Sequence, residues 1–283
     1  MGQGSTSGRG SYRGIVDFYD AEYAHLSMLR EDVPFMLAHF PRRACDVLEI
    51  AVCTGRAAVQ IAQHGHRVVG IDHDPQMIRA AEEKRSAFGI DPRRLQLHRV
   101  DALDLDLGRQ FDRVVLLFNT MLNFVELERL DRLLQRVKAH LKPAGRFWVD
   151  VFNPDPVRLA RRSERGIEPS VFHVPHLDRT VYRDMDIDID ATAQRQRICF
   201  NYRWFEAGGR ERRARVRFEL TFIFPRELRV LLERNGLGIE RWWGDYDGSP
   251  LDPDSPRIIA SVRHRRGDRG GRGRRPSRHG SGG

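Results

Sequence analysis

The stretch EIAVCTGRAA, residues 49–58, is the part of the sequence whose residue types and spacing best indicate ligand chemistry. It follows the apolar residues Val47 and Leu48, and a strand that leads into a glycine-type turn and a helix is a common way to hold a nucleotide-like ligand. Ala51 and Cys53 occupy positions where glycines would be expected. If Cys53 needs a left-handed backbone, the strain is roughly 1–2 kcal/mol, or about 10–30-fold in affinity. We therefore expect a weakened ligand loop that still works.

This loop belongs to a region, from Ala44 to about Ala160, in which strand-like and helix-like segments alternate. Apolar runs at 46–51, 67–72, 95–100, 113–119 and 146–152 alternate with helical patterns at 56–64, 75–88 and 126–141 and a turn at 142–145. Asp74 is the expected N-cap of the second helix. Continuous apolar runs separated by helices predict a parallel sheet buried on both faces, with ligands at the carboxyl ends of its strands. A further helix at 225–235 and strands at 237–244 and 257–263 complete the pattern.

Residues 181–222 have a different pattern, a strict alternation of apolar and polar residues that is typical of strands with one wet face. It predicts a three-stranded antiparallel meander with one apolar face, formed by Met185, Ile187, Ile189, Phe200, Tyr202, Trp204, Phe218 and Phe222. Such a face is too large to leave in water, so we expect it to roof the carboxyl ends of the sheet and set substrate choice. Four alternating aspartates, Asp184 to Asp190, face arginines on the next strand. They indicate cross-strand ion pairs rather than a calcium site.

The net charge of +9 comes mainly from the end of the chain. Residues 263–283 hold eight arginines and one aspartate and so contribute +7, which leaves +2 for residues 1–262. This Gly/Arg/Ser segment has too few apolar residues to fold. We predict a disordered N-terminus at 1–11, one α/β domain at 12–265 with an antiparallel insert at 179–224, and a disordered basic tail at 266–283.

Cysteine content and hydropathy indicate where the protein works. Cys45, Cys53 and Cys199 form no C-x-x-C motif, which favours a reducing compartment and argues against a zinc site. The first residues have no apolar signal region, and no apolar run approaches the roughly 20 residues of a membrane span. We therefore expect a soluble cytoplasmic protein with no bound metal, either a monomer or a homodimer.

Three motifs at strand ends resemble those of class I S-adenosylmethionine-dependent methyltransferases of the small-molecule branch, which carry an antiparallel insert before the last helix. VLEIAVCTGR is similar to the first motif of that family, VVGIDHDPQMI to the second and VDALDLDL to the third, and the likeness extends over roughly residues 12–265. The resemblance implies an α/β fold with a Rossmann-like, seven-stranded, mostly parallel sheet and helices on both faces. It also implies S-adenosyl-L-methionine as cofactor.

The resemblance also implies residues for the cofactor site. Asp72 would accept hydrogen bonds from the ribose hydroxyls, and Asp101 would accept one from the adenine amino group. FNTMLNF, after the fourth strand, would form the floor of the methyl-donor pocket. The full implied set is Glu49, Ala51, Cys53, Gly55, Asp72, His73, Met77, Asp101, Ala102, Phe118, Asn119 and Met121.

Methyl transfer from a sulfonium needs alignment and exclusion of water more than it needs a general base. Polar residues at strand ends, on the meander or on the first helix are candidates for the acceptor pocket: Tyr19, Asn123, Asn153, His173, Tyr202, Arg203 and Tyr246. His173 and His176 have a spacing that a metal site could use, but Pro175 interrupts it and no further ligand is evident. Cys53 precedes a helix, yet no neighbouring base would activate it, so we interpret it as a packing residue.

Three other functions remain alternatives to small-molecule methylation. The Arg/Gly tail could recruit RNA to an RNA methyltransferase through charge and stacking, although no motif N/D-P-P-Y/F follows the fourth strand. The substituted loop at Ala51 and Cys53 would suit a cofactor-binding protein without catalysis. A nicotinamide dehydrogenase would need the fingerprint G-x-G-x-x-G, which is missing.

Overall fold

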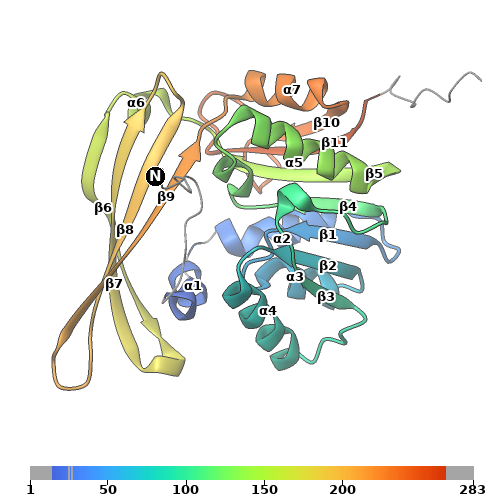
Figure 1. Cartoon of the computed structure of the whole chain (residues 1–283). Helices are drawn as coiled ribbons and strands as arrows, with labels where there is room; N and C mark the ends of the chain where they lie inside the picture. The colour runs from blue at the N-terminus through green and yellow to red at the C-terminus, as the bar shows by residue number, and fades with distance from the viewer. Residues whose placement is uncertain (1–14, 25, 27, 266–283) are drawn as a thin grey trace, which may run out of the picture.

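The computed structural model describes residues 15–24, 26 and 28–265 and arranges them around two sheets with a helix between them (Figure 1). The two segments predicted to be disordered, 1–11 and 266–283, lie outside the described residues.

The larger sheet has seven strands in the order β10-β11-β5-β4-β1-β2-β3. They are β1 Asp46–Ile50, β2 Arg67–Asp72, β3 Leu95–Arg99, β4 Phe111–Leu116, β5 Leu141–Phe152, β10 Leu237–Trp243 and β11 Arg257–His264. β1 to β5 pair in parallel, whereas β11 is antiparallel to both β5 and β10. The predicted seven-stranded, mostly parallel sheet is confirmed. β5 begins at Leu141 and runs through residues 142–145, which we predicted to be a turn, with a register shift against β4.

Helices cover both faces of this sheet, as predicted. α5 (Leu127–His140) and α7 (Pro225–Arg234) pack on one face, and α2 (Met28–Ala38) and α3 (Arg56–Gln63) pack on the other. Successive strand residues alternate between the two layers, since Val47 packs with α2 and α3 whereas Leu48 packs with α5. α4 (Pro75–Ala87) follows β2, and the Asp74 side chain caps it by accepting a hydrogen bond from the Gln76 N–H at 2.8 Å. The continuous apolar runs therefore follow from burial on two sides.

The smaller sheet is antiparallel and has four strands, which corrects the predicted three. They are β6 Ser163–Val174, β7 Arg179–Asp190, β8 Arg195–Phe205 and β9 Glu211–Thr221, in sequence order across the sheet. β6 shows no alternation because two register shifts, at Glu164/Ile167 and Ile167/Ser170, interrupt its pairing with β7. Such irregularities move side chains from one face to the other, so period-two patterning disappears. We call this element the roof sheet.

Short elements join the two sheets. α1 (Val16–Tyr23) lies between them, where its Phe18 packs on Tyr202 and Trp204 of the roof sheet (Figure 1). The remaining pieces are η1 Ala102–Asp104, η2 Thr120–Asn123, α6 Pro156–Leu159 and η3 Pro175–Leu177. α1, η2 and α6 bring the roof sheet against the carboxyl ends of the parallel strands, which is where ligands bind in sheets of this kind.

Candidate active site

One large cavity, of ≈ 1130 Å³, lies between the carboxyl ends of the parallel strands and the roof sheet. Its strand-end wall includes Ala51, Cys53, Asp72, His73, Met77, Asp101, Ala102, Phe118 and Asn119. Nine of the twelve residues implied for the cofactor site thus line one space. Its volume exceeds what a single small ligand usually fills and leaves room for two molecules side by side.

Asp72 fixes the shape of the loop that follows β1. Its Oδ2 atom accepts a hydrogen bond from the Cys53 N–H at 3.0 Å, and its Oδ1 atom accepts one from the Asp74 N–H at 2.9 Å. The residue is 5% exposed. Since each carboxylate oxygen can accept more than one hydrogen bond, both retain capacity for a ligand.

The loop itself has a left-handed backbone at every position where glycine was expected. Ala51, Cys53 and Gly55 have φ angles of 58°, 49° and 81°. At Gly55 a glycine is also required sterically, because an added Cβ would lie 3.1 Å from the Cβ of Ala81 on α4. We expected backbone strain at Cys53 if its conformation were left-handed. Both Cys53 and Ala51 have that conformation and therefore carry the strain.

Burial, with Asp72 nearby, raises the pKa of the Cys53 thiol to about 12. The thiol therefore stays protonated, in line with the interpretation of Cys53 as a packing residue rather than a nucleophile.

Glu49, at the end of β1, lines an adjoining cavity of ≈ 400 Å³ that shares Tyr19 and Cys53 with the larger one. Burial raises the pKa of its carboxyl to about 8, although Arg56 opposes the shift. Its Oε2 atom is buried with no hydrogen-bond partner among the described residues. Arg56 is engaged elsewhere, donating to Asp32 at 2.9 and 2.5 Å. A buried carboxylate oxygen without a donor is a place for a cationic or hydrogen-bond-donating group of a ligand.

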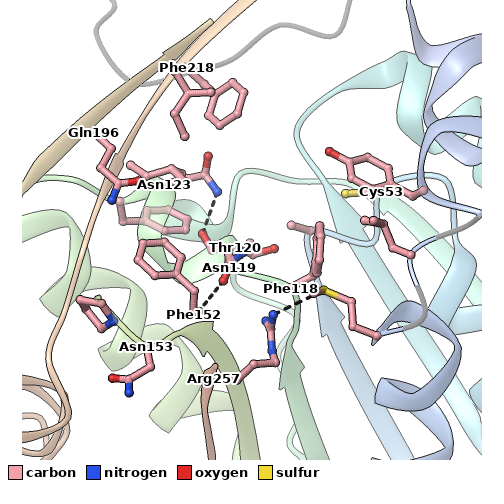
Figure 2. Close-up of a pocket in the computed structure, with 18 of the residues that line it drawn as sticks. Cys53, Phe118, Asn119, Thr120, Asn123, Phe152, Asn153, Gln196, Phe218 and Arg257 are labelled. Carbon is pink, nitrogen blue, oxygen red and sulfur yellow. Dashed lines mark hydrogen bonds between the residues drawn. The ribbon is translucent and has the colours of Figure 1, made fainter. Parts of the chain in front are cut away.

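The segment after β4 is the second left-handed stretch of the strand-end wall. Phe118 and Asn119 have φ angles of 50° and 62°. The Asp150 carboxylate accepts from the Phe118 N–H at 3.2 Å, and the Asn119 side chain accepts from the Phe152 N–H at 2.7 Å. These bonds hold the Phe118 ring at the centre of the site (Figure 2).

Beneath this segment, Asp150 joins a buried polar cluster. It accepts hydrogen bonds from Arg257 Nε at 2.6 Å and from the Tyr246 hydroxyl. The Arg257 guanidinium also lies 5.9 Å from the centre of the Phe118 ring. The cluster supports the floor from below, and of its members only Arg257 lines the cavity.

α1 closes the site along its edge and connects the two walls. Asp20 accepts from the Thr54 hydroxyl at 2.6 Å and from Lys84 Nζ at 2.7 Å, which ties α1 to the loop after β1 and to α4. On the other side, buried Glu22 accepts from the Tyr202 hydroxyl at 2.8 Å and from Arg183 at 3.1 Å. Burial raises the pKa of Glu22, against the effect of these two partners. One helix thus joins the ligand loop to the roof sheet.

The roof-sheet wall of the cavity is mainly apolar. Its inward residues are Met185, Ile187, Ile198, Phe200, Phe218 and Leu220, with the polar residues Arg183 and Gln196 and, from β6, Glu168. The prediction that an antiparallel element roofs the carboxyl ends agrees with this placement.

The acceptor candidates are divided between the cavity and its surroundings. Tyr19, Asn123 and Asn153 line the cavity. His173 is exposed on β6, and Arg203 lies on the outer face of β8 with its guanidinium over the Tyr182 ring. These two point away from the site because they occupy positions of the opposite strand face from the apolar row.

Four further predicted residues support the site from outside the larger cavity. Tyr202 and Tyr246 are buried and hydrogen-bonded to Glu22 and Asp150. Among the implied cofactor residues, Gly55 is the N-cap of α3 and Met121 is fully buried in the core.

The lining residues that were missing from the sequence-based set include Tyr23, Phe152, Arg183, Gln196 and Arg257. Tyr23 repeats Tyr19 one helical turn later and Phe152 follows a strand, so both had a local signal. The other three depend on which strand faces they occupy and on the sheet packing, which the sequence alone does not state.

The alternating aspartates of β7 do not make the predicted cross-strand ion pairs with β8. Asp188 pairs with Arg165 of β6 at 2.6 Å, and Asp186 accepts from Asn201 at 3.1 Å, whereas Arg197 lies 3.5 Å from Glu219 of β9. Arg195 likewise pairs with Glu126, before α5, at 2.7 Å rather than with an aspartate of β7. In the described part of the chain, no group of three or more His, Cys, Asp and Glu residues is placed to hold a metal ion.

Comparison with known proteins indicates which class of protein has this fold and cavity. Residues 47–145 match the methyltransferase domain family. Over 246 residues the chain is 26% identical to a cypemycin N-terminal methyltransferase from Streptomyces sp, covering 86% of this chain and 93% of the relative. It is 35% identical to a demethylmenaquinone methyltransferase from Thermus thermophilus, over 47% of this chain and 57% of the relative.

Solved structures agree in fold. The sugar N-methyltransferase KedS8 from Streptoalloteichus sp superposes with a TM-score of 0.68 at 24% identity, covering 93% of this chain and 99% of that one. The CcbJ methyltransferase from Streptomyces caelestis gives 0.66 at 24% identity, covering 83% and 94%. Residues 47–145 therefore form a methyltransferase domain, and the chain shares the fold of S-adenosylmethionine-dependent methyltransferases. Among the described residues, no helix has the length and apolarity that crossing a membrane requires.

Proposed function

We propose that the protein transfers the methyl group of S-adenosylmethionine to an amine nitrogen of a small, mainly apolar molecule held under the roof sheet. The observation that carries this proposal is the apolar inner face of β7, β8 and β9, which meets the strand-end wall across a single cavity. An apolar wall excludes water from the reacting atoms and selects acceptors by shape.

The proposed cofactor contacts follow from the donor groups that each wall residue can satisfy. Asp72 suits the two ribose hydroxyls and Asp101 suits the adenine amino group, since each is a carboxylate at the cavity wall. The buried, unpartnered oxygen of Glu49 suits the ammonium of the amino-acid end. When bound, the cofactor supplies a methyl group on a sulfonium. The protein's own task is to align the acceptor and keep water out.

Nitrogen is favoured as the accepting atom for two reasons. A free amine can attack the methyl group without first losing a proton, whereas a hydroxyl acceptor needs a general base to remove its proton. On the part of the roof-sheet wall that the structure describes, the ionisable residues are Arg183 and Glu168, and Glu168 is exposed. In addition, KedS8 is named a sugar N-methyltransferase, and the cypemycin relative is named an N-terminal methyltransferase.

An RNA acceptor remains a weaker alternative, because the Arg/Gly tail on which it rests lies outside the described residues. A cytoplasmic location agrees with the three free cysteines. The cytoplasmic location and the monomeric or dimeric state both stay predictions.

The test is donor consumption against matched acceptors that share one cyclohexyl group: an amine, an alcohol and a carboxylate, with total RNA as a fourth arm. We expect S-adenosylhomocysteine to form with the amine, most strongly above the amine's own pKa, where the free base predominates. Asp72→Ala protein serves as the control for background. Turnover of RNA, or of the alcohol alone, would contradict the proposal.

A further inference from the structure

Gln196 is an uncharged polar side chain in the mainly apolar wall that the roof sheet presents to the cavity. Gln196 points inward on β8, in the same row as Ile198, Phe200 and Tyr202, and opposite Leu220 of β9. The residue is 7% exposed and lines the cavity, yet its amide makes no hydrogen bond to any described residue. It is the one uncharged polar residue that the described part of the roof sheet presents to this cavity.

The polar atoms of Gln196 are open to the cavity, so water can satisfy them in the free protein. A leucine of similar size would continue the apolar row of this wall, whereas the amide gives the wall both a donor and an acceptor group. A ligand that displaces this water leaves the amide without a partner unless it replaces the hydrogen bonds. We therefore expect a molecule in the cavity to hydrogen-bond to Gln196.

A second amide lines the same cavity. Asn123, in η2, donates from Nδ2 to the Thr120 carbonyl at 3.2 Å. This bond fixes the orientation of the amide and leaves its Oδ1 atom as an acceptor. Figure 2 shows Asn123 and Gln196 near each other, with Phe218 and Phe152 on either side of them and Cys53 beyond Phe118. We call Gln196 and Asn123 the amide pair.

The charges near the amide pair are already engaged. Arg183 of β7 donates to Glu22 at 3.1 Å and to the Glu168 carbonyl at 3.2 Å. Arg129 of α5 also lines the cavity and lies 6.0 Å from the centre of the Phe124 ring. A carboxylate ligand would face the acceptor atom Oδ1 of Asn123, whereas an ammonium ligand could not donate to the Nε2 atom of Gln196.

We propose that the amide pair binds an uncharged hydroxyl or primary amide group of the acceptor, at a distance from the nitrogen that is methylated. A hydroxyl donates to Asn123 Oδ1 and accepts from Gln196 Nε2, and a primary amide can in addition donate its second N–H to Gln196 Oε1. The apolar walls enclose the hydrocarbon between the two ends of the acceptor. This inference rests on the proposed function, because it assigns specificity within the same cavity. It makes the two amides specificity-determining residues rather than catalytic ones.

The experiment measures binding, so that its outcome does not depend on methyl transfer. Calorimetry is performed on the protein saturated with S-adenosylhomocysteine, using cyclohexylmethanol, cyclohexanecarboxamide, cyclohexanecarboxylate and protonated cyclohexylmethylamine as probes. We expect the alcohol and the carboxamide to bind at least tenfold more tightly than the two charged probes. In Gln196→Leu that preference should fall to within about twofold, with S-adenosylhomocysteine affinity unchanged.

Stability separates a binding role from a structural one. Gln196→Leu should melt at the same temperature as the parent or higher, because the Gln196 amide makes no hydrogen bond to a described residue that the change could remove. The same substitution at exposed Gln96 of β3 is the matched control and should change neither binding nor specificity. If the carboxylate binds more tightly than the other probes, which would indicate Arg129 as its partner, the proposal is wrong. It is also wrong if neutral-probe affinity is unchanged in Gln196→Leu, or if no probe binds. Failure of the amine to be methylated would instead contradict the proposed function.

Discussion

The two walls of the cavity are built in different ways. The strand-end wall consists of loops with left-handed residues at Ala51, Cys53, Phe118 and Asn119. The N–H groups of the last three donate to Asp72 or Asp150. The roof-sheet wall is regular strand backbone in β8 and β9, and it presents mostly apolar side chains to the cavity.

The two walls suit the two ligands that we propose for them. The cofactor is the same in every reaction, so loops of fixed backbone geometry with charged side chains can match its polar groups. An acceptor wall of exchangeable apolar side chains on a regular sheet can change its shape without disturbing the cofactor loops. We infer that specificity of this enzyme resides in the roof sheet and that donor affinity resides in the strand-end loops.

The largest expected effect comes from Asp72→Ala, in the strand-end wall. The change removes the acceptor for the N–H groups of Cys53 and Asp74 and, by our proposal, for the ribose hydroxyls. We expect S-adenosylhomocysteine affinity to fall at least tenfold by calorimetry. Asp91→Ala, which removes another aspartate that accepts from a backbone N–H, is the control and should leave affinity unchanged. Equal affinities for the Asp72 variant and the parent would refute this view of the wall.

Tyr202→Phe tests the connection between the walls. It removes one of the two donors to buried Glu22 and should lower the free energy of unfolding by about 1–3 kcal/mol. Tyr182→Phe, on the outer face of the neighbouring strand, is the control and should have little effect. Chemical denaturation measures both. If the two variants unfold alike, α1 is not fastened to the roof sheet through Glu22.

The smallest expected effect is a gain in stability from Cys53→Gly. Relief of left-handed strain, less the added chain entropy of glycine, should stabilise the protein by about 0.5–1 kcal/mol. Ala57→Gly, in the helix that follows, should destabilise it by about 1 kcal/mol. Thermal melting of both variants provides the measurement. A loss of stability in Cys53→Gly would mean that the packing of the thiol outweighs the strain.

Local signals located most of the larger sheet and much of the strand-end wall. β2 was predicted at its observed bounds, α3 and α4 end within one residue of their predicted ends, and Asp74 is the cap that its sequence context predicted. These features depend on neighbours in the chain. β6 was missed because its register shifts erase the alternation. Residues 142–145 lie within β5 at an irregularity, between the pairs Phe111–Leu141 and Arg113–Arg146.

The sequence by itself determined the α/β order, the acidic strand ends and the loop positions that replace glycine, because each depends on a few consecutive residues. Only the tertiary structure decided that Gln196 faces the cavity whereas Arg203 faces away, and that Glu22 lies between the two walls. A strand pattern gives two faces but does not say which one meets the rest of the molecule. That choice, made by packing between residues far apart in the chain, placed the Gln196 amide at the wall of the cavity.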